Sequence, residues 1–204
     1  KSDPIDALAV ARAALREPEL PVARLDGPAR ELQLLVDHRD DLVAERTRVI
    51  NRLRWHLHEL DPAVTLPARS LSRAPATHLA AIEALLSRLD GDGNKVVAQL
   101  ASQLVARVRE LNAQVDQLEA DLTPRVRRLA PSLLALAGCG VLTAAKLVGE
   151  TADIRRFHSK DAYARHNGTA PLPVWSANKQ RHRLSRTGNR QLNLALHRIA
   201  ITQA

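Results

Sequence analysis

Two long stretches of regularly spaced aliphatic residues constrain the fold of this chain more than any other feature. In residues 29–60, Leu and Val recur at close to a 3.5-residue repeat, which Arg39 and Arg46 interrupt. In residues 94–122, one apolar stripe recurs every seven positions, at Val97, Leu104, Leu111 and Leu118. This spacing keeps an apolar seam on one side of a helix. The sequence therefore predicts a mainly α chain built on a long coiled-coil helical hairpin.

The segments between these stripes indicate how the helices connect. Three prolines mark residues 61–75 as a connector, residues 76–90 suggest a shorter helix, and Gly91-Asp92-Gly93 breaks it. Two long helices joined in this way favour an antiparallel coiled-coil hairpin or a dimerisation arm. The ordinary core of a helical bundle explains the same stripes equally well. The coiled coil, if present, predicts a homo-oligomer.

Composition excludes several classes of protein. Aromatic residues make up 2% of the 204 residues, while hydrophobic residues make up 45%. This argues against a sheet that stacks RNA bases on exposed Phe and Tyr. The single Cys139 excludes an internal disulfide framework and a Cys-rich zinc site. No apolar run reaches the roughly 18 residues needed to span a bilayer, so we expect a cytoplasmic protein without a membrane partner.

Positive charge gathers in the last quarter of the chain. Residues 151–204 hold ten Lys and Arg against two Asp and Glu, whereas residues 1–150 hold 20 of each kind. Five cations lie within twelve residues of a predicted loop at 168–188 and its end: Lys179, Arg181, Arg183, Arg186 and Arg190. Such density is suited to phosphate contacts and predicts a nucleic-acid partner. The alternative is a solvated basic face.

A glycine pair opens the C-terminal region, which we expect to be a small helical domain. Gly138 and Gly140 flank Cys139, and a helix is predicted to begin near Leu142. This pattern is typical of a helix-hairpin-helix motif, in which the backbone and the N-terminus of the following helix bind a phosphate. A tight turn between two packed helices would need the same residues. Cys139 is then expected to be a small buried residue.

Two further groups of residues have the chemistry of phosphoryl transfer. Asp3 and Asp6 project from one face of a predicted helical turn, and paired carboxylates suit Mg²⁺. Acidic residues in a first turn also serve as ordinary partners of the helix dipole. Ser176 precedes the run of cations, so its hydroxyl is a candidate nucleophile for a phosphodiester. A lone serine in a loop is more often a turn or cap residue.

Together these stretches resemble transposases of the insertion sequence 110 family. The resemblance lies in Asp3-x-x-Asp6, in Leu136 to Phe157, and in the run Tyr163 to Pro171 followed by Ser176 and by Arg186-Thr187-Gly188-Asn189-Arg190. It implies three regions: residues 1–27 as the end of a RuvC-like DEDD domain, 28–129 as a coiled-coil linker, and 130–204 as a C-terminal transposase domain. Because the chain starts at Lys1 and stops in an apolar run, we expect a fragment of a longer protein.

The resemblance implies an RNA-guided DNA recombinase of a bacterial insertion sequence. Ser176 would attack the DNA backbone, Asp3 and Asp6 would bind Mg²⁺, and a noncoding guide RNA would pair with the DNA. The family usually shows Ser-Ser-Gly or Ser-Gly-Gly where this chain has Trp175-Ser176-Ala177. Because the other DEDD acids would precede Lys1, we expect this chain alone to be inactive. The alternatives are a non-enzymatic helix-hairpin-helix DNA-binding module on a dimeric coiled coil, and a structural coiled-coil protein with a basic tail.

Overall fold

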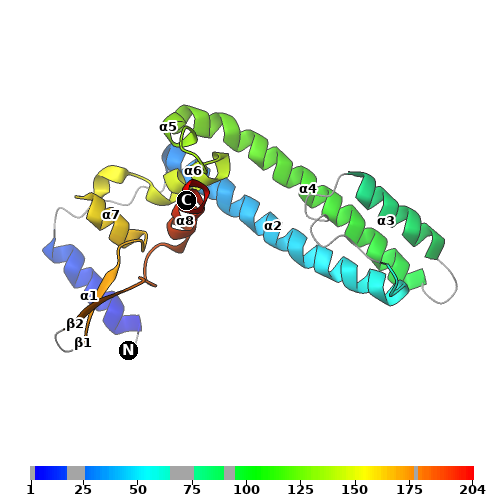
Figure 1. The fold of residues 1–204 in the computed structure, drawn as a ribbon, viewed down its shortest axis with the longest axis horizontal. Coiled ribbons are helices and arrows are strands. Elements are labelled where there is room, and N and C mark those ends of the chain that lie inside the picture. Colours follow the sequence, from blue (N-terminus) through cyan, green and yellow to red (C-terminus); the bar gives the residue numbers. More distant parts are fainter. Residues whose placement is uncertain (1–2, 18–25, 65–75, 90–94, 177–178) are drawn as a thin grey trace.

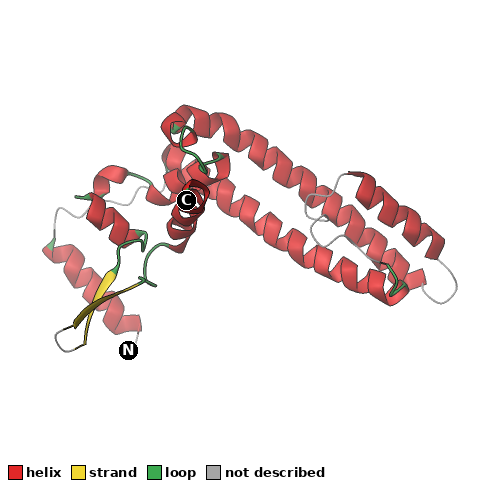
Figure 2. Cartoon of the chain, viewed as in Figure 1, coloured by secondary structure: helices red, strands yellow, loops and turns green. Residues whose placement is uncertain are grey.

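The computed structural model confirms the mainly helical class and describes residues 3–17, 26–64, 76–89, 95–176 and 179–204 (Figure 1). The helices are α1 (Asp3–Arg16), α2 (Gly27–Leu60), α3 (Ala76–Leu89), α4 (Lys95–Leu129), α5 (Pro131–Leu134), α6 (Val141–Thr151), η1 (Ile154–Arg156, a 3₁₀ turn), α7 (Lys160–His166) and α8 (Arg190–Gln203). Two short strands, β1 (Leu172–Ser176) and β2 (Lys179–Arg183), form an antiparallel ribbon (Figure 2).

The two longest helices, α2 and α4, lie side by side in opposite directions (Figure 1). Pro28 stands in the first turn of α2, where its missing N–H costs no hydrogen bond, and the helix ends before Asp61-Pro62. α4 continues to Leu129, past the predicted end at residue 122, although Pro124 lies inside it. The residues Leu122 and Val126 are fully buried on either side of that proline. Their burial offsets the cost of about 3 kcal/mol that an internal proline imposes on a helix.

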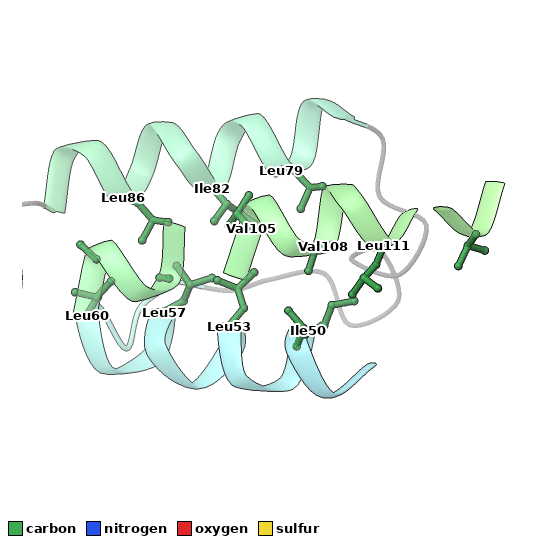
Figure 3. Close-up of a cluster of buried hydrophobic side chains, with 14 of the residues drawn as sticks. Ile50, Leu53, Leu57, Leu60, Leu79, Ile82, Leu86, Val105, Val108 and Leu111 are labelled. Atoms are coloured by element: carbon green, nitrogen blue, oxygen red, sulfur yellow. The ribbon is translucent and has the colours of Figure 1, made fainter. Parts of the chain in front are cut away.

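The first hydrophobic core draws its residues from α3, α4 and the far half of α2, with both α2 and α3 packed against α4 (Figure 3). Leu53 and Leu57 of α2 and Leu111 of α4 belong to this core, and Leu79 and Leu86 reach it from α3. All five are almost fully buried, and burial of each leucine contributes about 1.5–3 kcal/mol. A third helix therefore covers one end of the antiparallel pair, as in a bundle. Coiled-coil geometry and dimerisation stay predictions.

The two arginines that interrupt the apolar repeat both reach across to α4. The Arg39 guanidinium contacts the carboxylate of Glu119 at 2.6 Å. Arg46 is 7% exposed, and its Nη1 donates to Asn112 Oδ1 at 2.8 Å. Such directional contacts fix the register of one helix against the other, because a shift of either helix would leave buried polar groups without partners.

A second hydrophobic core joins the near ends of α2 and α4 to α6 and α8. Its fully buried members are Leu32, Leu122, Val126, Ala144, Ala145 and Leu192. Gly149 of α6 lies so close to α2 that a Cβ there would be 2.9 Å from the Gln33 backbone. The C-terminal helices thus pack directly on the long hairpin, so this core draws residues from both sides of the predicted boundary between residues 129 and 130. The domain division itself stays a prediction.

The predicted loop at residues 168–188 contains the ribbon of β1 and β2, which the sequence analysis missed. Pro171, Pro173 and Gly188 favoured a loop. A two-stranded ribbon tolerates Pro173 because each strand has an open edge on which no N–H is needed. The signal for a strand was the alternation of cations with Gln180 and His182.

Some predicted features lie outside the described residues: the connector beyond residue 64, the break at Gly91-Asp92-Gly93, and residues 177–178. The side chain of Ser176 lies outside them as well, although its backbone is part of β1. Among the helices of the described ranges, none has the length and apolarity needed to cross a membrane.

Candidate nucleic-acid interface

Three of the predicted phosphate contacts lie on strand β2. Lys179, Arg181 and Arg183 are exposed and alternate along the strand, so their side chains leave the same face of the ribbon. None of the three forms an ion pair with a residue that the structure describes. The opposing residues Leu172 and Val174 on β1 are half-buried. We call Lys179, Arg181 and Arg183 the cationic face, and it is available to a polyanion.

The candidate nucleophile Ser176 is the last residue of β1. The strand register pairs it directly with Lys179, at the end of the cationic face. The neighbouring Trp175 is paired with Gln180 and is 66% exposed. Because successive side chains of a strand point to opposite faces, Trp175 lies on the face of the ribbon away from the cations.

Two glycines bring the ends of the ribbon segment together. A Cβ on Gly188 would lie 2.3 Å from the backbone nitrogen of Gly168, a distance that real Cβ atoms do not adopt. Gly168 has φ +75°, in the left-handed region that favours glycine. The close approach fixes where the chain leaves α7 and where it returns toward α8. These glycines therefore allow the two ends of the ribbon segment to lie close together.

Asn189 connects that junction to the rest of the molecule. Its side chain caps α8 by accepting from the backbone of Gln191 and Leu192, each at 3.0 Å. Its amide donates to Glu150 of α6 at 2.6 Å, and its backbone N–H donates to the carbonyl of His166 at 2.7 Å. The remaining two predicted cations, Arg186 and Arg190, flank this residue and are exposed.

A small aromatic cluster supports α7 beneath the junction. The only Phe and Tyr of the chain, Phe157 and Tyr163, meet edge to face with ring centroids 5.1 Å apart. Arg156 lies over the Phe157 ring, and its Nη2 is 3.2 Å from His166 Nε2. Burial and the positive charge of Arg156 lower the pKa of His166, although Glu150 opposes them. Nothing in the spacing of Phe157 and Tyr163 along the sequence predicted this contact.

The two predicted glycines of the helix-hairpin-helix motif have different surroundings. Gly138 has φ +81°, and a Cβ there would lie 2.7 Å from the Thr202 side chain of α8. Packing against α8 thus explains why this position is a glycine. Gly140 precedes α6 and faces open space, because no described atom lies within 4 Å of the point that a Cβ would occupy. Cys139 between them is 4% exposed, which confirms that it is a small buried residue, and burial raises the pKa of its thiol.

The predicted metal ligands Asp3 and Asp6 lie in the first turn of α1, which buries none of its residues. The described part of the chain contains no group of three Asp, Glu, His or Cys side chains that could hold a metal ion. The structure thus brings the two carboxylates together on one turn without further ligands. Along the longest axis of the molecule, α1 and the ribbon lie at the same end, away from α3 (Figure 1).

A mixed-charge network lies between α2 and α6. Lys146 pairs with Asp40 and donates to Gln191 at 2.9 Å. The pKa of nearby Asp37 is raised by burial first, and then by the negative charges of Glu150 and Asp40. Because the Lys146 ammonium already interacts with Asp40 and Gln191, we interpret this cluster as a contact that holds the helices together.

Comparisons with known proteins match both ends of the chain. A family profile described as the transposase IS116/IS110/IS902 family matches residues 130–204. A profile of the IS110-type DEDD transposase matches residues 1–62. Together these two matches extend over more than half of the chain.

Several curated proteins are similar to most of the chain. An uncharacterised 44.8 kDa protein of insertion element IS116 from Streptomyces clavuligerus is 27% identical, over 85% of this chain and 53% of that protein. The transposase for insertion element IS1111A of Coxiella burnetii is 27% identical, over 88% of this chain and 48% of its own length. A probable family 20 transposase of Pseudomonas aeruginosa is 26% identical, over 96% and 57%. The chain spans about half the length of these relatives. With a DEDD transposase match at its N-terminal end and a transposase match over the ribbon and its supporting helices, the chain belongs to the IS116/IS110/IS902 family of transposases.

Proposed function

We propose that this chain is the part of a DNA transposase that holds a nucleic-acid backbone on the cationic face of its ribbon and presents Ser176 to it. The observation that carries the proposal is the strand register, which places Ser176 opposite Lys179 and in line with Arg181 and Arg183. Exposed cations without ion-pair partners in the described structure supply the sequence-independent affinity that phosphate contacts give. DNA is the partner that membership of a transposase family favours.

The chemistry proposed for Ser176 is a transesterification. The serine oxygen forms a bond to a backbone phosphorus while the bond from that phosphorus to a deoxyribose oxygen breaks. The serine proton is released, and the departing deoxyribose oxygen takes up a proton. Lys179 and the arginines would neutralise the charge that develops on the phosphate oxygens. Attack by a second deoxyribose hydroxyl would reverse these steps and join new strands.

The DEDD match supports use of a divalent metal by the full-length protein, with Asp3 and Asp6 as two of its ligands. Two carboxylates on one exposed turn do not make a magnesium site by themselves, because Mg²⁺ requires a near-octahedral set of oxygen ligands. We therefore assign no catalytic step to a metal here, and we expect this chain alone to bind nucleic acid without cleaving it. A guide RNA and assembly into a homo-oligomer belong to the same proposal for the full-length protein.

The test compares two sets of three substitutions that remove the same charge. One variant replaces Lys179, Arg181 and Arg183 by Ala, and the control replaces Lys95, Arg48 and Arg52, which are exposed on α4 and α2. Binding of a labelled oligonucleotide is measured across a range of salt concentrations. The ribbon variant should lose affinity, and the slope of log affinity against log salt should fall by about 2 to 3, at 0.7–0.9 per phosphate contact. Equal losses in both variants would show that only net charge matters.

The alternative of a non-enzymatic binding module is distinguished by Ser176→Ala in the full-length transposase. If the proposal is right, strand exchange is lost and oligonucleotide affinity is retained. Unchanged strand exchange would remove Ser176 from the chemistry and leave the ribbon as a binding element alone.

A further inference from the structure

The two faces of the ribbon differ sharply in chemistry. The strand register pairs Trp175 with Gln180 and Pro173 with His182, so these four residues share the face that points away from the cations. Trp175, Pro173, Gln180 and His182 are all exposed. We call them the tryptophan face. It combines a large flat ring with an amide and an imidazole, which are the groups that contact nucleobases rather than phosphates.

Within the described part of the chain, Trp175 has no evident structural role. The indole is 66% exposed, whereas Phe157 and Tyr163 pack against one another in the aromatic cluster. An exposed tryptophan leaves a large flat ring in water, and tryptophan is enriched where proteins contact their partners. The nearby cationic face indicates that the partner on this surface is a polyanion that carries flat apolar groups.

We propose that the indole of Trp175 stacks on an unpaired nucleobase of the strand whose phosphates lie on the cationic face. The proposal rests on the proposed function, because it requires that face to hold a nucleic-acid backbone. A nucleotide carries its phosphate and its base in different directions, and a ribbon with cations on one face and a ring on the other matches that division.

The base that meets Trp175 is unpaired for a geometric reason. In a duplex, neighbouring base pairs cover both flat surfaces of each base, so an indole reaches one only when the base leaves the stack. Trp175 immediately precedes Ser176, and a base held there would fix which phosphate lies beside the candidate nucleophile. Trp175 is thus a positioning residue, and Gln180 lies beside it for hydrogen bonds to the edge of the base.

The chain contains two tryptophans, which allows a direct optical test. Trp55 is 69% exposed in a single copy of the chain and so matches Trp175 there, and it belongs to α2, which extends away from the ribbon (Figure 1). The variant Trp55→Phe reports Trp175 alone, and Trp175→Phe reports Trp55 alone. Each is titrated with single-stranded DNA, single-stranded RNA and duplex DNA of the same length. Quenching of Trp175 by a single strand, with little quenching by the duplex and none of Trp55, is the expected result.

Affinity supplies a second readout. Trp175→Ala should weaken binding of the single strand by roughly tenfold, and Trp175→Phe, which keeps an aromatic ring, should restore most of that loss. Quenching by DNA, by RNA or by both supports the inference and identifies the strand. Salt-sensitive binding with unchanged Trp175 emission would overturn the stacking and leave the proposed function intact. If the chain binds none of the three oligonucleotides, both the stacking inference and the proposed function are refuted. If Trp175 emission changes with protein concentration alone, Trp175 contacts a second protein and the stacking inference is overturned.

Discussion

At the scale of single residues, His166 links the aromatic cluster to the ribbon junction. Its ring centroid lies 5.0 Å from that of Phe157, and its backbone carbonyl accepts from Asn189 at 2.7 Å. Its neutral Nε2 can accept a hydrogen bond from Arg156 Nη2 at 3.2 Å. Protonation would place a second positive charge against Arg156, which is why burial and Arg156 lower the pKa of His166. The fold therefore depends on the neutral ring.

This lowered pKa predicts how stability changes with pH. Between the folded pKa and the ordinary value of 6.5, the unfolded chain binds more protons than the folded chain, so the free energy of unfolding rises with pH and levels off above 6.5. Urea unfolding of the chain between pH 5 and pH 8 measures this slope. His166→Gln should flatten it, whereas His158→Gln, at an exposed neighbour, should leave it unchanged. An unaltered slope in the His166 variant would mean that other groups determine how the free energy of unfolding changes with pH.

At the scale of elements, substitutions of Gly149 and Gly140 distinguish a glycine required for helix packing from one that is not. Gly149→Ala would place a Cβ 2.9 Å from the backbone of Gln33, and neither helix can yield there without losing contacts in the second core. We expect a loss of about 1–3 kcal/mol in the free energy of unfolding, as for other overpacked sites. Gly140→Ala meets open space at an ordinary φ of −76° and should leave stability unchanged. Thermal and urea unfolding of the two variants beside the unmodified chain measure the difference.

The Gly140→Ala variant also tests the predicted phosphate site before α6. If the backbone at Gly140 approaches a phosphate closely, Gly140→Ala lowers oligonucleotide affinity while thermal unfolding stays at the level of the unmodified chain. If affinity also stays unchanged, Gly140 is only part of a turn between packed helices. Gly138→Ala is unsuitable for this purpose, because its φ of +81° and the Thr202 side chain make a loss of stability certain to accompany any effect.

The helices and strands also show which parts of the fold can be predicted from the sequence and why the other parts cannot. Prolines and the 3.5-residue repeat were sufficient for α2, because local spacing determines where a long amphipathic helix begins and ends. The extension of α4 through Pro124 depends on burial of Val126 against α6 and α8, which is a tertiary effect. The ribbon was missed because Pro173 is compatible with a strand only when that strand has an open edge. The cations of the site were found from charge alone, but their division from Trp175 required the strand register.

At the scale of the whole molecule, α2 and α4 serve two cores at once. Their near ends bury Leu32 and Leu122 against α6 and α8, and their far ends bury Leu53 and Leu111 with α3. The hairpin thus extends well away from the ribbon while remaining packed to the helices that support it (Figure 2). Trp55 lies on α2, among the residues of the far core, yet it is 69% exposed and so is not part of that core.

The exposure of Trp55 bears on how the chain assembles. An exposed indole on a projecting helix favours association with a second copy of the chain, because aromatic side chains are enriched where protein surfaces meet. We expect sedimentation velocity to show a concentration-dependent dimer, and Trp55→Glu to shift it to monomer by placing charge in the interface. Trp175→Glu, at a tryptophan of similar exposure on the ribbon, should leave the dimer intact. A monomer at every concentration would refute self-association of this chain, and a dimer that survives Trp55→Glu would place the contact on another surface.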